Sequence, residues 1–161
     1  TLLSHMARPY SIYETREEFS SEQLDPRAVQ CITSTVADLM SSETEKTLNR
    51  FSDILLLGHD WAEDQERLLS LLSIFTGAGH QLDGGQAPRV GVIGSRSKWQ
   101  SFEQEALREG IPQHLLDQVL CPIGMNIGAE SPEEIAVAVV AQILSAHEGV
   151  RPEQPTWRQS S

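Results

Sequence analysis

Four short apolar runs alternate with longer amphipathic segments along the chain. The runs at residues 10–14, 28–33, 53–57 and 89–93 have the length and side chains of β-strands. The segments at residues 36–50, 62–75, 99–109 and 112–120 are helix-prone, and several carry apolar residues at helical spacing. Because the strand runs are apolar rather than half polar, the pattern predicts a mostly parallel sheet covered by helices on both faces, a three-layer αβα fold.

A last helix is predicted from its start signal. Ser131 can cap it, Pro132 suits the first helical position, and Glu134 completes a capping box. The run from Ile135 to Leu144 is apolar almost all round, which predicts burial on most sides. The chain therefore reads as one domain over residues 1–150, followed by a polar, flexible tail over residues 151–161.

The net charge and the cysteine content limit the classes of partner and the cellular setting expected for the protein. The net charge of −11 disfavours nucleic acid and anionic membranes as bulk partners, although backbone N–H groups can still build a local anion pocket. Two cysteines without a CxxC motif fit a reducing, cytoplasmic setting. No apolar run is long enough for a membrane span, and residues 1–10 lack the pattern of a signal peptide.

Two stretches at predicted strand ends are candidates for ligand binding. Glu14 ends the first strand, where an acidic side chain can accept hydrogen bonds from a ribose; a solvated carboxylate is the alternative. Gly94, Ser95, Arg96 and Lys98 follow the fourth strand and open a helix, so they can bind an anion through free N–H groups and cationic side chains. The alternative there is a capped helix with two solvated cations.

Three further features of the sequence each allow a functional and a structural interpretation. His59 and Asp60 follow the third strand and can form a hydrogen-bonding pair, but Asp60 also suits a helix N-cap. Cys121 can ligate molybdenum or take part in sulfur chemistry, or it can pack as a small apolar residue. The glycines at 77 and 79 lack the spacing of a phosphate loop, and no metal-ligand spacing occurs, so no metal site is predicted.

Four segments resemble, in order, the C-terminal Rossmann-like domain of the XdhC/CoxI family of xanthine dehydrogenase accessory proteins. They are Y-E-T-R-E-E-F at residues 13–19, L-G-H-D with Asp64 at residues 57–64, V-G-V-I-G-S-R-S-K at residues 90–98, and C-P-I-G, I-G and P-E-E-I-A-V within residues 121–137. Glu14 stands where the family has Asp, and Gly58 where it has Thr.

The resemblance implies a Rossmann-like fold that lacks its first, central strand and glycine-rich loop in this sequence. The family's N-terminal domain, with its S-G-G-C motif, is not visible either. A sheet without that strand leaves two edges unpaired, so a strand from upstream in an intact chain or from a partner is expected. The cofactor-binding residues that strand position and resemblance together indicate are Glu14, Arg16, His59, Asp60, Gly94, Ser95, Arg96, Lys98, Cys121 and Gly124.

The resemblance further implies a chaperone rather than an enzyme. Such a protein would bind molybdenum cofactor (molybdopterin), or a nucleotide, and deliver it to a xanthine dehydrogenase-like molybdoenzyme in the cytoplasm. One alternative is an NAD(P)-binding oxidoreductase domain, although no catalytic Tyr/Lys pair is visible and fold alone does not confer chemistry. A structural or dimerisation module with a vestigial pocket is another, and the last helix can pack against a second copy in a homodimer.

Overall fold

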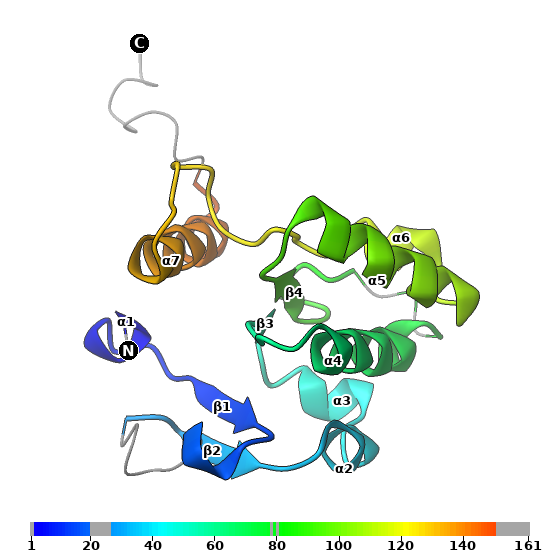
Figure 1. Cartoon of the computed structure of the whole chain (residues 1–161). Coiled ribbons are helices and arrows are strands. Elements are labelled where there is room, and N and C mark those ends of the chain that lie inside the picture. The colour runs from blue at the N-terminus through cyan, green and yellow to red at the C-terminus, as the bar shows by residue number, and fades with distance from the viewer. Residues whose placement is uncertain (1, 20–26, 78, 80, 151–161) are drawn as a thin grey trace.

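The structure is a computed structural model that describes residues 2–19, 27–77, 79 and 81–150 (Figure 1). The polar tail predicted over residues 151–161 lies outside them. The strands are β1 (Ser11–Glu14), β2 (Gln30–Thr33), β3 (Asp53–Leu56) and β4 (Arg89–Val92), so each predicted strand is confirmed at a slightly shorter length. The helices, listed in chain order, are α1 (Leu2–His5), the 3-10 turn η1 (Glu17–Phe19), α2 (Val36–Ser41), α3 (Glu45–Leu48), α4 (Trp61–Phe75), α5 (Arg96–Arg108), α6 (Gln113–Leu116) and α7 (Pro132–Glu148).

The strands pair in parallel, as predicted, but as two separate pairs. β1 pairs with β2, and β3 pairs with β4. A parallel bridge between Gly91 and Leu120 extends the second pair beyond β4. Among the described residues nothing pairs with the outer edge of β1 or with that of β3. The missing central strand is expected to lie between β1 and β3. Direct pairing of β1 with β3 would contradict that expectation, and these two strands do not pair.

Alternating residues of β3 and β4 build two apolar layers. Leu56, Val90 and Val92 belong to the large core together with side chains of α4 and α5, and the core residues Leu68, Leu72, Phe75, Phe102 and Ala106 are almost completely buried. On the opposite face, Leu55 and Ile93 pack with Ile123 and with Val139 and Ile143 of α7. The α4–α5 layer and α7 therefore lie on opposite faces of the strands, which confirms the αβα arrangement (Figure 1).

The prediction of one helix over residues 36–50 is wrong, because this segment forms two short helices, α2 and α3. Ser41 and Ser42 each donate a hydroxyl hydrogen bond back to the carbonyl groups of Asp38 and Leu39, which ends α2. Thr44 then caps α3 and forms a capping box with Thr47. The competing side-chain hydrogen bonds explain why a single helical pattern does not produce one helix.

The last helix starts as predicted but is less buried than predicted. Ser131 and Glu134 form the capping box, Pro132 opens the helix, and Gly149 ends it in the left-handed conformation with a φ of 64°. Ala138, Val139, Val140 and Ile143 are buried, whereas the side chains of Ala136 and Val137 are exposed. One face of α7 therefore packs on the strands and another remains open to solvent.

Candidate functional site

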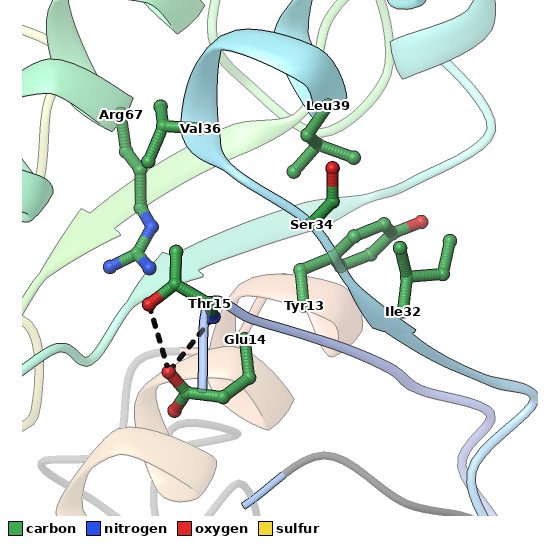
Figure 2. Close-up of a pocket in the computed structure, with 8 residues that line it drawn as sticks. All are labelled: Tyr13, Glu14, Thr15, Ile32, Ser34, Val36, Leu39 and Arg67. Carbon is green, nitrogen blue, oxygen red and sulfur yellow. Dashed lines mark hydrogen bonds between the residues drawn. The ribbon is translucent and has the colours of Figure 1, made fainter. Parts of the chain in front are cut away.

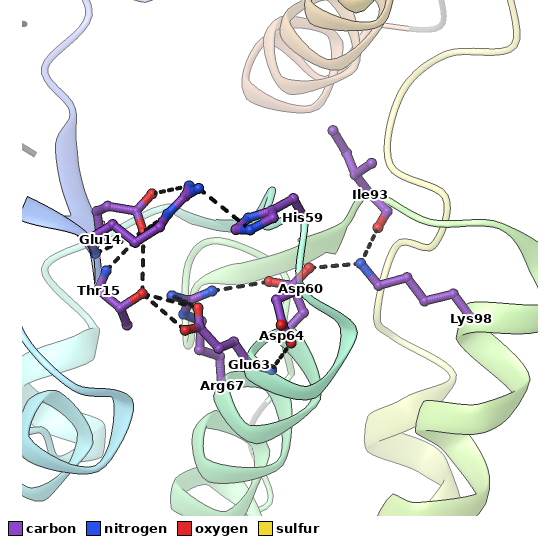
Figure 3. Close-up of polar contacts among 10 residues, drawn as sticks. Glu14, Thr15, His59, Asp60, Glu63, Asp64, Arg67, Ile93 and Lys98 are labelled. Atoms are coloured by element: carbon purple, nitrogen blue, oxygen red, sulfur yellow. Dashed lines mark hydrogen bonds and ion pairs between the residues drawn. The ribbon is translucent and has the colours of Figure 1, made fainter. Parts of the chain in front are cut away.

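A chain of polar contacts runs across the carboxyl ends of β1, β3 and β4 (Figure 3). The Thr15 hydroxyl, just after β1, donates to both carboxylate oxygens of Glu63 on α4, at 3.0 and 3.1 Å. Arg67 pairs with Glu63 at 3.0 Å and with Asp64 at 3.2 Å. Asp64 in turn accepts from the Lys98 ammonium of α5. The chain links the two strand pairs through side chains at the edge where parallel α/β folds bind ligands.

Glu14 and Arg16 form a tight pair at the end of β1. The Arg16 guanidinium donates through Nε and Nη2 to the two carboxylate oxygens of Glu14, at 3.1 and 3.0 Å. The backbone N–H groups of Thr15 and Arg16 also donate to Glu14 Oε1. Together, with the Arg16 side-chain hydrogen bond as the largest cause, these contacts lower the pKa of Glu14 to about 2. The carboxylate is thus already engaged, and its predicted contact with a ribose stays a prediction.

The lowered pKa of Glu14 predicts acid-dependent stability. Its value falls from 4.5 to about 2, so Glu14 stabilises the folded state above pH 4.5 and loses that contribution as the pH falls toward 2. We expect the protein to lose more unfolding free energy over this interval than Glu14→Gln, which has no carboxylate to protonate. Urea unfolding at a series of pH values measures the difference. Parallel pH profiles of the two proteins would contradict the assignment.

His59 and Asp60 take different roles in the turn between β3 and α4. Asp60 caps α4 by accepting a hydrogen bond from the Glu63 backbone N–H at 3.0 Å, so the N-cap interpretation is confirmed. This contact is the main reason that the pKa of Asp60 is lowered. The His59 side chain is exposed, and its Nε2 lies 3.5 Å from Arg16 Nη1 of the other strand pair. The cofactor contacts predicted for His59 and Asp60 stay predictions.

Lys98 lies inside the protein instead of at its surface. Its side chain is 5% exposed, and its Nζ donates to Asp64 Oδ2 at 2.7 Å and to the Ile93 carbonyl at 3.0 Å. Asp64 is fully buried. A buried ammonium requires such partners, and they leave it little capacity for a ligand. This corrects the expectation of a solvated cation at this position, and a cofactor contact of Lys98 stays a prediction.

Two glycines make room for the buried pair. A Cβ atom on Gly58 would lie 2.2 Å from Asp64 Oδ1, and one on Gly94 would lie 2.8 Å from Lys98 Cδ. The turn after β3 therefore approaches the Asp64 carboxylate, and the turn after β4 approaches the Lys98 stem, more closely than any other residue type allows. Glycine at these two positions therefore leaves room for the ion pair.

Gly58→Ala is therefore expected to destabilise the protein. The added methyl group displaces a carboxylate that Arg67 and Lys98 both hold, and overpacking of this kind costs about 1–3 kcal/mol. Urea unfolding measures the change. Gly77→Ala is the matched control, because a Cβ there meets nothing within 4 Å. Equal effects of the two substitutions would show that the close approach to Asp64 is unimportant.

The remaining predicted residues occupy the start of α5 and the loop before α7. Ser95 caps α5 by accepting from the Lys98 backbone N–H, and Ser95 and Arg96 are both exposed. Cys121 is half-buried against the large core, and burial raises the pKa of its thiol, which disfavours the reactive thiolate. Gly124, with a φ of 118°, donates its N–H to Gln142 Oε1 of α7 at 2.6 Å. Gly124 thus anchors a loop, and the cofactor contacts predicted for Cys121 and Gly124 stay predictions.

The residues at the centre of the polar network lie outside the predicted site. Thr15, Glu63 and Arg67 were not among the predicted site residues, and Asp64 was noted only as part of a motif. A signal existed, because acidic residues three and four positions before Arg67 favour ion pairs on one helix face. The contact between Thr15 and Glu63 spans 48 residues and carries no such local signal.

The described residues enclose little space at this edge. A cavity of about 10 Å³, roughly one water molecule, lies between β1, β2 and α2 and is lined by Tyr13, Glu14, Thr15, Ile32, Ser34, Val36, Leu39 and Arg67 (Figure 2). A larger cavity of about 200 Å³ lies under α7, at the far side of the strands, between Leu55, Gly91, Leu120, Ile123 and Ile143.

Within the described ranges, no group of three His, Cys, Asp or Glu side chains is arranged to hold a metal ion. None of the helices there has the length and apolar character required to cross a bilayer.

The parallel strands, the αβα layers and the polar carboxyl edge define a Rossmann-type α/β domain. The model of the XdhC Rossmann domain matches residues 1–143, and the chain belongs to this family. A solved structure from Bacillus halodurans, named a xanthine dehydrogenase, superposes with a TM-score of 0.66 at 20% identity, over 98% of this chain and 41% of that one. An uncharacterized Escherichia coli K12 protein, YqeB, is 40% identical over 55 residues, which is 34% of this chain and 10% of YqeB. The chain thus spans less than half of either relative.

Proposed function

We propose that this domain belongs to an accessory protein that binds molybdenum cofactor, or a nucleotide, and passes it to a xanthine dehydrogenase-type molybdoenzyme. Membership of the XdhC family is the observation that carries the proposal. The polar carboxyl edge of the strands supports it, since ligands of parallel α/β folds bind there. The name of the Bacillus halodurans structure points to the same class of enzyme.

The side chains that would hold the cofactor are those exposed along this edge. Arg16 and His59 present donors beside the ends of β1 and β3, and Ser95 and Arg96 do so at the start of α5. These groups suit the phosphate that molybdopterin and nucleotides share. The fit concerns the phosphate alone, because the small cavity near Glu14 is too small for a pterin ring. We propose binding and handover as the activity.

Copurification and transfer test the proposal. We expect the intact protein, purified under reducing conditions, to retain molybdopterin and to activate the apo form of a xanthine dehydrogenase-type enzyme. Arg16→Gln combined with Arg96→Gln is expected to reduce both readouts. The matched control is Arg108→Gln, an exposed cation paired with Glu105 away from this edge. Full transfer by the Arg16/Arg96 double variant would place the cofactor elsewhere.

We further propose that the domain works in the cytoplasm as a homodimer. The open face of α7, where the Val137 side chain is 51% exposed, supplies an apolar surface for a second copy. Light scattering after size exclusion gives the mass directly. A monomer at all concentrations tested would refute the dimer without touching the cofactor proposal.

A further inference from the structure

The Arg16 guanidinium is held in a fixed position at the end of β1. Glu14 binds its Nε and Nη2 from one side. The guanidinium carbon lies 4.2 Å from the centre of the Phe19 ring, so the group also stacks on an aromatic face. A fork held on two sides loses little freedom when it binds a ligand. The third nitrogen, Nη1, is the one left to point away from these partners.

That nitrogen faces His59 of the other strand pair. Arg16 Nη1 lies 3.5 Å from His59 Nε2, at the limit of hydrogen-bond distance, and donates to it when the imidazole carries its proton on Nδ1. When Nε2 carries a proton, both nitrogens only donate. An acceptor oxygen that lies between them then satisfies both donors. Both side chains are open to solvent, and 38% of the Arg16 side chain is exposed.

The other cations of the network are already committed. Lys98 binds Asp64 and the Ile93 carbonyl inside the protein. Arg67 divides its donors between Glu63 and Asp64, and 18% of its side chain is exposed. Glu14 is neutralised by Arg16, while Asp60 directs a carboxylate oxygen to the start of α4. Arg16 is thus the cation of this network with a donor that faces an accessible space.

We propose that Arg16 and His59 together bind the phosphate, or another tetrahedral oxyanion, of the ligand. The site joins the two strand pairs and moves the anion away from Lys98, where the sequence placed it. Glu14 then acts as a positioning residue that aims the guanidinium, and it does not bind a ribose. The inference rests on the proposed function only for the identity of the molecule that carries the phosphate.

Inorganic phosphate is the probe that tests the site. Titration followed by ¹H–¹⁵N NMR is expected to give saturable shifts at the backbone amides of Thr15, Arg16 and His59, with sodium chloride at equal ionic strength as the reference. Arg16→Gln and His59→Gln are each expected to weaken binding about tenfold, the effect of losing one charge-assisted hydrogen bond. Arg108→Gln is expected to bind phosphate like the parent protein.

Three outcomes would overturn the site: no difference between phosphate and chloride, equal affinity in the parent, Arg16→Gln and His59→Gln proteins, or shifts confined to Ser95 and Arg96. Displacement of phosphate by AMP from the same amides would identify a nucleotide as the ligand class. Phosphate binding there without displacement by AMP would support another monoester, such as a pterin phosphate. Since no molybdopterin enters this experiment, the site can fail while the accessory function stands, and the reverse.

Discussion

Lys98→Met is expected to lower the free energy of unfolding by about 3 kcal/mol, one of the two largest effects that the structure predicts. The substitution removes the ammonium group but keeps an apolar stem of similar length. Asp64, which is fully buried, then retains only Arg67 as a charged partner, at 3.2 Å. Removing one member of a buried ion pair typically costs about 3–5 kcal/mol, and the Arg67 contact places the expected loss at the lower end. Urea unfolding at neutral pH measures it.

A double substitution separates this cause from loss of packing. Lys98→Met combined with Asp64→Leu removes both charges of the pair, and Arg67 keeps its ion pair with Glu63. Replacing both members of a buried pair by apolar residues is often neutral, so the double variant is expected to be about as stable as the parent or within about 1 kcal/mol of it. If instead the two losses simply added, the damage would come from lost packing and the pair would carry no coupling energy.

The strands and the layered arrangement were within reach of sequence reasoning. Each strand lies in a short β-prone run of the sequence, and the start of α7 is marked by Ser131, Pro132 and Glu134, all within one turn. Such signals are local, because strand alternation and helix capping depend on residues a few positions apart. The break between α2 and α3 was not predicted. The hydroxyl groups of Ser41 and Ser42 bond to carbonyl groups three residues earlier, and these bonds compete with the helical hydrogen bonds over the same sequence distance.

The sequence predicts where the polar edge lies but not which of its charged side chains pair with each other. The sequence puts Glu14, His59 and Lys98 at strand ends, and parallel strands bring those ends together. It does not reveal that Lys98 turns inward to Asp64, 34 residues away, because a lysine after a strand is more often solvated. Gly58 and Gly94, whose turns approach Asp64 and Lys98 closely, are a local trace of that arrangement. Partner choice among charges depends on tertiary packing, which periodicity does not encode.

The second large effect is a slowing of amide hydrogen exchange, expected at the unpaired edges of β1 and β3 when a further strand pairs with them. In β3 the carbonyl groups of Ser52 and Leu56 accept from Arg89 and Ile93 on the β4 side. Alternating residues of a parallel strand direct their backbone groups to opposite edges, so Leu55 directs its groups to the unpaired edge. By the same reasoning Tyr13 does so in β1, since the carbonyl groups of Tyr10 and Glu14 accept from the β2 side. The unpaired groups and the nearby apolar cavity beneath α7 favour one more parallel strand.

We expect this strand to come from another part of a longer chain or from a partner protein. Hydrogen exchange measures its arrival, because an amide that gains a ladder hydrogen bond exchanges only when the sheet opens. In a protein that contains the added strand, the hydrogen-exchange rates of the Leu55 and Tyr13 amides are expected to fall by about a hundredfold. This change corresponds to about 2.8 kcal/mol of opening free energy. The amides of Ile93 and Ile123, which already bond to Leu56 and Val92, are the internal controls and should change far less. If Leu55 and Tyr13 exchanged at the same rate with and without the added segment, the two strand pairs would be complete as they stand, and Thr15 and Glu63 would be their principal link across the polar edge.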